Sequence, residues 1–367
     1  MTRLLTSKPF DFKNNSFDFI RFLLAIMVIV SHTGGIGEYN WEPHIKMRDW
    51  DPTHTNLGTF SVYGFFIISG FLITRSFLNT ASIGNFIANR IKRVYPGFVV
   101  SLFFTSFLFI PLYFFLKNGF DIAKLYSNYN LDITQYFVKN IFIEMRKPTI
   151  AIENIKLFDI NGPYWTLIHE VRAYFLVLIL GFLGILNKRY VIIFFGLLLN
   201  TIYSLNSLGV NFIGKDWSFK DFFGSYIGDC HLLILFCYFI FGMLFYLFQE
   251  KIIWNNWIYA ISILGLVIGW KLDVFPIFAP TCFTYVVLYS SQILPFQKIV
   301  SRIGDLSYGI YIYSWPIQIC LLYLGLNKIT GNKYYNYTLF AAISIFISMM
   351  AGYLSWNLVE KRWLVKK

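Results

Sequence analysis

Residues 17–32, FDFIRFLLAIMVIVSH, form a nearly continuous apolar run that contains Arg21 and His32. A charge at the centre of a membrane helix costs on the order of 2.5–3.5 kcal/mol, so it is rarely kept without a partner or a water-filled cavity. Eleven steps of about 100° return to nearly the same azimuth, so both residues share one helix face, roughly 16 Å apart along the axis. That helix face is therefore expected to contact a polar partner or a water-filled cavity.

The composition extends this interpretation to the whole chain. Of its 367 residues 57% are hydrophobic and 14% are charged, whereas a soluble domain has about 25% charged residues. Apolar ranges recur, each near the roughly 20 residues needed to cross a bilayer. They lie at 17–36, 57–78, 95–116, 164–186, 190–208, 231–248, 254–270, 274–294, 304–325 and 336–358. The sequence predicts an all-α integral membrane protein of about ten transmembrane helices, a single domain over residues 1–367 without an attached soluble domain.

The distribution of basic residues predicts the orientation. With a cytoplasmic N-terminus, the inner flanks carry 16 Lys and Arg and the short outer loops carry 7, as the positive-inside rule requires. Both termini are then cytoplasmic, and the segments 37–56 and 117–163 face outward, where they could shape an acceptor site. The net charge of +12 comes mainly from basic residues on these cytoplasmic flanks, where membrane orientation and anionic lipids favour them. We therefore expect no nucleic-acid partner.

Cysteines and histidines show no metal-binding pattern. No C-x-x-C spacing is present, so the cysteines are interpreted as small buried apolar residues, and we expect neither a disulfide framework nor a metal site. They are Cys230, Cys237, Cys282 and Cys320.

The segment RIKR, residues 90–93, precedes the third apolar range. Arg90 and Arg93 are three residues apart and would share a helical face, while Pro96 is expected to mark the entry into the next helix. Two guanidinium groups so placed can bind phosphate bidentately. The alternative is a positive-inside anchor without a ligand.

The segment GPYWTLIHEVRAYFL, residues 162–176, enters the fourth apolar range from outside. Tyr164 and Trp165 suit either an interfacial aromatic belt or a substrate site. Glu170 lies inside an apolar helix with Tyr174 one turn later, so the two are expected to face the same way. His169 and Arg172 flank Glu170, although His169 could simply face solvent.

The segment GDLSYGIYIYSWP, residues 304–316, opens the ninth apolar range. Tyr308, Tyr311 and Trp315 follow a helical spacing and predict a ribbon of aromatic rings, which serves either a ligand or ordinary helix packing. Asp305 and Ser307 are interpreted as the helix cap.

Together these segments resemble the acyltransferase 3 family of polytopic membrane O-acyltransferases. The resemblance rests on an Arg, ten residues and a His at Arg21 and His32, on FFIISGFLI at residues 65–73, on Arg-x-x-Arg at 90–93, and on WTLIHE at 165–170. Thr166 stands where the family usually has serine. Ser314 replaces a histidine found in many relatives, which leaves His32 as the candidate for the central base.

The resemblance implies transfer of an acyl group, most often acetyl, from cytoplasmic acyl-CoA to a hydroxyl of an outward-facing or lipid-linked sugar. The acceptor expected from it is a cell-surface polysaccharide such as an O-antigen, capsule or exopolysaccharide, at the cell's inner membrane. Acyl-CoA, usually acetyl-CoA, is then a donor substrate, and no permanently bound cofactor is expected.

The resemblance also implies roles for individual residues. His32 is the candidate general base or transient acyl carrier, and apolar surroundings favour the neutral imidazole that either role needs. Glu170 and Arg21 are the other catalytic candidates. Arg90, Arg93 and Arg21 are candidates for binding the donor. The candidates for binding the acceptor are Ser69, Tyr164, Trp165, Tyr174, Tyr308 and Tyr311.

A second hypothesis is a transporter or flippase for a lipid-linked glycan or an anionic solute, because ionisable residues inside a membrane also mark transport pathways. The sequence shows no inverted halves and no nucleotide-binding P-loop, which favours the enzyme.

Overall fold

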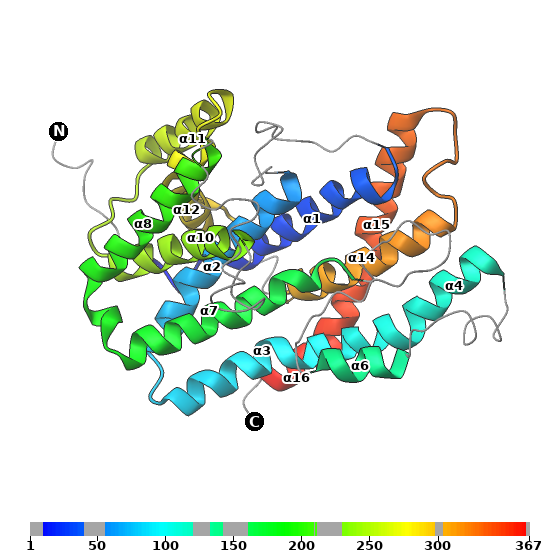
Figure 1. Cartoon of the computed structure of the whole chain (residues 1–367), viewed down its shortest axis with the longest axis horizontal. Helices are drawn as coiled ribbons and strands as arrows, with labels where there is room; N and C mark the ends of the chain where they lie inside the picture. Colours follow the sequence, from blue (N-terminus) through cyan, green and yellow to red (C-terminus); the bar gives the residue numbers. More distant parts are fainter. Residues whose placement is uncertain are drawn as a thin grey trace. The chain divides into compact units, whose positions relative to one another are not determined.

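The computed structural model describes residues 10–39, 56–119, 133–141, 161–208, 210, 230–297 and 304–364. Within these ranges the chain is built of helices and contains no strand (Figure 1). The two segments expected to shape an acceptor site fall largely outside the described residues. The chain is an all-α membrane protein.

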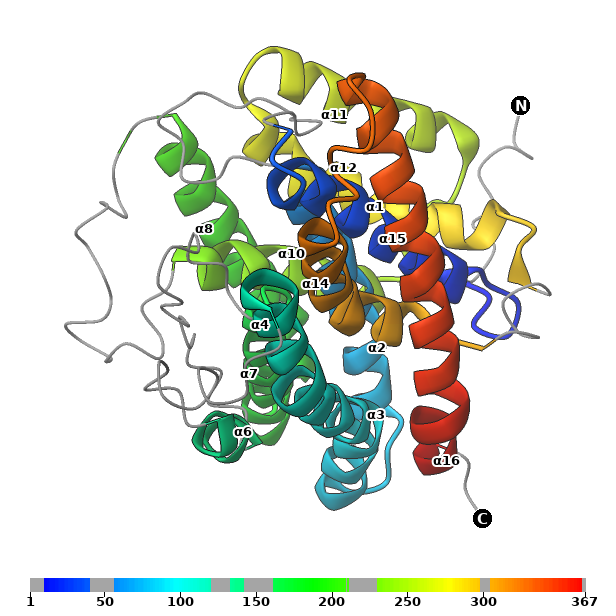
Figure 2. The same ribbon diagram turned by 90° about the vertical axis from the view of Figure 1, so that its right-hand side faces the viewer.

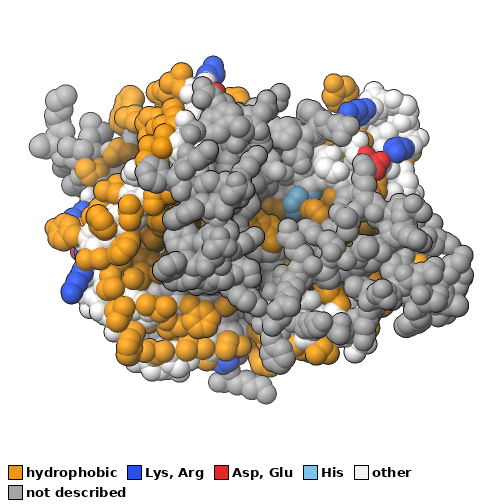
Figure 3. Space-filling view, viewed as in Figure 1, with side chains coloured by type: hydrophobic (Ala, Val, Ile, Leu, Met, Phe, Trp, Pro, Cys, Tyr) orange, Lys and Arg blue, Asp and Glu red, His pale blue; other side chains and the backbone are white. Residues whose placement is uncertain are grey.

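Each of the ten predicted apolar ranges contains a helix in the described part of the chain. Among the described residues, six helical segments are long and apolar enough to cross a membrane, and Leu232–Leu247 and Asn256–Lys271 are shorter apolar helices. Large apolar side chains such as Phe182 and Trp257 remain exposed, at 78% and 75%. Figure 3 shows hydrophobic side chains over much of the described surface on one face. Such a surface is expected where lipid is the solvent.

The chain folds as two compact units, which are described separately. The first unit comprises Met1–Leu24, His44–Phe86 and His169–Arg302, and the second comprises Ala25–Pro43, Ile87–Ile168 and Ile303–Lys367. Three helices contribute residues to both units; they are α1 (Phe17–Ile36), α3 (Ile83–Phe104) and α7 (Tyr164–Phe182).

The first unit is organised around α10 (Cys230–Leu247), which packs on α2 (Leu57–Leu78), α8 (Arg189–Ser207) and α12 (Phe275–Ile293) (Figure 1). The last of these also packs on α11 (Asn256–Lys271). A short 3₁₀ turn, Ile185–Asn187, precedes α8.

The close contact of α2 with α10 depends on two glycines. A Cβ at Gly70 would lie 2.0 Å from the carbonyl oxygen of Phe239, and a Cβ at Gly242 would lie 2.2 Å from the carbonyl oxygen of Ile67. Small residues of this kind let membrane helices approach backbone to backbone. Gly70 belongs to the FFIISGFLI run, so the structure gives part of that motif a packing role.

The second unit is organised around α14 (Ser307–Tyr323), which packs on α15 (Lys333–Ser355) and α4 (Ile110–Asn118) (Figure 2). The described part of this unit also contains η2 (Thr105–Phe109), α6 (Ile133–Ile141), η4 (Trp356–Glu360) and α16 (Lys361–Leu364). Both η2 and η4 are π-helical turns. At Gly309 a Cβ would lie 2.8 Å from the Cα of Gly352, so α14 and α15 also meet through glycines.

Polar side chains fix several helix starts. Asn56 accepts a hydrogen bond from the Thr59 amide at 2.7 Å, and Asn255 accepts one from the Ile258 amide at 2.8 Å. These contacts satisfy amides that the first helical turn leaves without partners.

The start of α3 differs from the prediction. We expected a helix to begin near Pro96, but α3 begins at Ile83 and contains Pro96. The reason is the hydroxyl of Ser82, which accepts a hydrogen bond from the Asn85 amide at 3.2 Å and starts the helix well before the proline. A proline removes one backbone donor, which membrane helices tolerate. Arg90 and Arg93 therefore lie on the same helix as Pro96.

Candidate functional site

His32 meets a tryptophan within the second unit. The imidazole lies edge-on to the ring of Trp315, with ring centroids 4.7 Å apart and planes at 87°. Gly162 also lies against Trp315, because a Cβ added to this glycine would be 3.0 Å from the indole. The sequence predicted Trp315 as part of an aromatic ribbon but not its contact with His32. The indole can thus hold the imidazole in one orientation.

One nitrogen of the His32 imidazole is available for chemistry. Nδ1 is buried and has no hydrogen-bond partner among the described residues. A buried polar atom without a partner is costly, and a catalytic or ligand-binding role is one reason for keeping such an atom. His32 can therefore accept a proton or a hydrogen bond at this atom.

Gln318 fixes the helix turn that carries His32. Its amide nitrogen donates to the carbonyl oxygen of Ile29 and to the hydroxyl of Thr33, both at 3.0 Å. Gln318 and Thr33 are fully buried. Helical periodicity alone does not single out Gln318, although a primary amide one turn beyond Trp315 in an apolar helix indicates a buried hydrogen bond.

A set of buried hydroxyls surrounds Tyr164. Its hydroxyl lies 2.7 Å from the Ser101 hydroxyl and 3.2 Å from the Thr105 hydroxyl, and Tyr164 is only 6% exposed. The Tyr311 hydroxyl lies 2.8 Å from that of Thr166. Tyr164 therefore lies in the interior, not in an interfacial belt, and these two tyrosine hydroxyls bond to protein groups.

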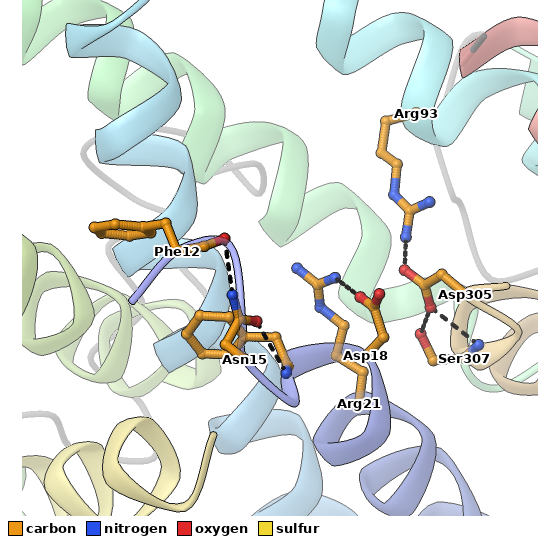
Figure 4. Close-up of polar contacts among 8 residues, drawn as sticks. Phe12, Asn15, Asp18, Arg21, Arg93, Asp305 and Ser307 are labelled. Atoms are coloured by element: carbon orange, nitrogen blue, oxygen red, sulfur yellow. Dashed lines mark hydrogen bonds and ion pairs between the residues drawn. The ribbon is translucent and has the colours of Figure 1, made fainter. Parts of the chain in front are cut away.

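Arg93 forms an ion pair with Asp305 at the start of α14 (Figure 4). Asp305 also accepts hydrogen bonds from the amide and the hydroxyl of Ser307, so its predicted capping contacts are present. Nearby, the Tyr308 hydroxyl donates to the carbonyl oxygen of Val94 at 2.9 Å. The Asp305 side chain is 8% exposed and that of Arg93 is 23% exposed. Arg93 therefore has a structural contact that the sequence did not indicate.

Arg21 belongs to the first unit, where Nη1 lies 3.1 Å from Oδ1 of Asp18 (Figure 4). The two residues are three positions apart and are therefore neighbours on one helix face. Ser69, another residue of this unit, is partly exposed on α2 beside Gly70.

The part of α7 in the first unit carries two polar pairs. The Tyr174 hydroxyl donates to the carboxylate of Glu170, as the spacing of four residues predicted. Nδ1 of His169 lies 3.3 Å from Nη1 of Arg172. The alternative that His169 simply faces solvent is wrong, because this residue is 2% exposed. Trp165, in the second unit, is partly exposed.

These contacts bring a candidate general base and its supporting residues together in one unit, and comparison with known proteins agrees with the chemistry. The profile of a family described as an acyltransferase domain matches residues 14–357. A protein named O-acetyl transferase from Shigella phage Sf6 is 27% identical over 96% of this chain and 97% of its own length. No solved structure matches the chain. Because the profile covers nearly its full length, the chain belongs to the acyltransferase 3 family.

Proposed function

We propose that this protein transfers an acyl group, in the simplest case acetyl, from cytoplasmic acyl-CoA to a sugar hydroxyl. The acceptor is an outward-facing or lipid-linked sugar of a cell-surface polysaccharide, such as an O-antigen, capsule or exopolysaccharide repeat, at the cell's inner membrane. Membership of an acyltransferase family supports the reaction class. The observation that carries the assignment is the buried, unpartnered Nδ1 of His32 beside Trp315, within the part of the chain that the structure describes.

His32 acts as the general base in this proposal. The acceptor oxygen attacks the thioester carbonyl carbon, a carbon–oxygen bond forms and the carbon–sulfur bond breaks. The hydroxyl proton passes to the imidazole and then to the departing thiolate, giving an ester and free coenzyme A. Trp315 and Gln318 are positioning residues, because they act through the orientation of His32 and of its helix turn.

Donor recognition is assigned to cations. Arg90 binds a phosphate of the donor, whereas Arg93 both contributes positive charge and ties α3 to α14 through Asp305. Arg21 supports the donor with the charge that Asp18 orients.

Acceptor recognition is assigned to Glu170 and to aromatic side chains. The carboxylate already accepts a hydrogen bond from Tyr174, and its remaining lone pairs can accept from sugar hydroxyls. Trp165 and Tyr308 are only partly buried, so their rings can pack against a pyranose. Ser69, Tyr164 and Tyr311 are the other candidates for binding the acceptor. The two tyrosines would contact it through their ring faces, because their hydroxyls lie within hydrogen-bond distance of protein hydroxyls.

The test is coenzyme A release from acetyl-CoA by the purified protein in nanodiscs, with extracted lipid-linked glycans as the acceptor pool. We expect His32→Ala to lower kcat by about 10²–10⁴-fold, the usual contribution of a general base. Ser31→Ala is the matched control, because it changes the adjacent buried residue of the same helix. Full activity of His32→Ala would refute the catalytic role of His32. If the wild-type protein releases no coenzyme A, the proposed donor or the proposed acceptor is wrong.

A further inference from the structure

The first unit contains a pocket of about 470 Å³ where the chain enters α1. Its walls are residues 12–19 and Arg21, with Leu72 and Arg75 from the end of α2 and Phe296 and Gln297 beyond α12. We name it the Arg75 pocket. Its volume lies within the range of about 300–1,000 Å³ that is typical of small-molecule sites.

Three helix ends meet at the Arg75 pocket: the start of α1, the end of α2 and the end of α12. If the predicted helices alternate in direction from a cytoplasmic N-terminus, all three ends lie on the cytoplasmic side. The pocket is then on the side of the membrane where acyl-CoA is present.

The charges that line the pocket favour an anion. Lys13, Arg21 and Arg75 oppose one carboxylate, Asp18, which pairs with Arg21. The guanidinium of Arg75 lies 4.0 Å from the ring centroid of Phe12. No carboxylate is paired with Arg75 in the part of the chain that the structure describes. The aromatic ring therefore orients the guanidinium without using its N–H groups, which suit a phosphate.

The wall made by the N-terminal segment is firmly attached. The Ser16 amide donates to the Ser291 carbonyl oxygen at 2.7 Å, and the Ser16 hydroxyl donates to the Leu294 carbonyl oxygen at 2.6 Å. The Asp11 amide donates to the side chain of Gln292 at 2.9 Å. Asn15 closes the turn before α1 by donating to the Phe12 carbonyl oxygen at 3.0 Å (Figure 4). A wall fixed in this way lowers the entropic cost of binding.

An aromatic surface accompanies the charges. The ring of Phe296 lies 4.1 Å from that of Phe19, centroid to centroid, and both residues line the pocket. A flat heteroaromatic group can pack on such rings. The pocket thus combines phosphate-binding cations with a surface for a base.

We propose that the Arg75 pocket binds the phosphorylated adenosine end of the acyl donor, with Arg75 and Lys13 on its phosphates. The proposal rests on the acyl-CoA dependence proposed above. Coenzyme A carries phosphate at two positions, the diphosphate and the 3′-phosphate. The donor therefore has phosphate groups for this subsite as well as for Arg90. The shared chemistry, an anionic phosphate beside an apolar group, also occurs in phospholipid headgroups, and the experiment separates the two sources.

The experiment measures binding of adenosine 3′,5′-bisphosphate to the full chain by isothermal titration calorimetry. The protein is placed in nanodiscs of neutral phosphatidylcholine and, separately, of phosphatidylglycerol. We expect Arg75→Gln to weaken binding by about tenfold or more, the effect of losing one charge-assisted hydrogen bond, and Lys13→Gln to weaken it less. Arg75→Lys should recover part of the loss because it restores the charge.

Arg189→Gln is the matched control. Arg189 is likewise an arginine at a helix end in the first unit and lies over an aromatic ring, 5.8 Å from the centroid of Phe248, but it does not line the pocket. Equal binding by the Arg75→Gln and Arg189→Gln variants would overturn the proposal. Nucleotide binding that phosphatidylglycerol abolishes in wild type, but not in Arg75→Gln, would also overturn it by assigning the pocket to a lipid headgroup.

Coenzyme A release separates this proposal from the function on which it rests. If wild type turns over acetyl-CoA and Arg75→Gln raises KM about tenfold at unchanged kcat, the subsite is supported. If wild type turns over and Arg75→Gln has an unchanged KM, the subsite is refuted while the proposed function stands. If wild type binds the nucleotide in an Arg75-dependent way but releases no coenzyme A, the subsite stands and the proposed acyl transfer fails.

Discussion

Replacing Gly70 with alanine tests the close contact between α2 and α10. The new Cβ would lie 2.0 Å from the Phe239 carbonyl oxygen, whereas ordinary Cβ contacts begin at 3.4 Å. The difference must come from movement of a helix backbone, because no flexible side chain can yield. Overpacking of this kind costs roughly 1–3 kcal/mol, and we take the upper end because backbone must move. Alanine returns about 1 kcal/mol through its helix propensity.

The net loss of unfolding free energy for Gly70→Ala is thus about 2 kcal/mol. For a chain of 367 residues that corresponds to a fall in Tm of roughly 2–3 °C. The assay is thermal unfolding of the purified protein in detergent, followed by fluorescence-detected size-exclusion chromatography. Gly84→Ala is the control, since its Cβ would meet no atom within 4 Å, and it should be neutral or stabilising. A Tm for Gly70→Ala at or above that of Gly84→Ala would refute the reasoning.

Three further changes test the second unit. Arg93→Gln is expected to cost about 3 kcal/mol of unfolding free energy because it removes the ion pair that Arg93 forms with the buried Asp305 carboxylate. In a double-mutant cycle with Asp305→Asn the losses should be clearly less than additive, and additive losses would show that the pair is not coupled. Gln318→Leu removes two hydrogen bonds and should lower the free energy of unfolding, measured by chemical denaturation, by about 1–3 kcal/mol. An unchanged denaturation midpoint would argue against these hydrogen bonds. Trp315→Ala should lower kcat roughly tenfold to a hundredfold through misplacement of His32, whereas Trp315→Phe should retain most activity, and equal kcat for the two variants would argue against orientation by the ring.

The helices could be predicted from sequence because each apolar range is long enough to be recognised on its own. Local pairs could also be predicted, since residues three or four apart on a helix are neighbours. The contacts of Arg21 with Asp18 and of Tyr174 with Glu170 are of this kind. The predicted start of α3 was wrong because the hydroxyl of Ser82 caps the helix well before Pro96, which α3 contains.

Long-range contacts could not be predicted from a single sequence. Arg93 and Asp305 are 212 residues apart, and nothing in either segment specifies the other. The sequence therefore left phosphate binding and a positive-inside anchor open for Arg93 and indicated a helix cap for Asp305. The contact of His32 with Trp315 could not be found for the same reason, because periodicity identifies a helix face but not the element that packs on it.

The π-helical turn at Thr105–Phe109 affects how this chain should be compared with its relatives. A π turn holds about one residue more than an α turn, so a relative that lacks one residue here can keep the same helices on both sides. Sequence alignments seldom place a gap inside a membrane helix, and without one every later position in that helix would be rotated by about 100°. A single-residue gap at 105–109 would keep Ser101 and Tyr113 in their correct registers, on opposite sides of the turn.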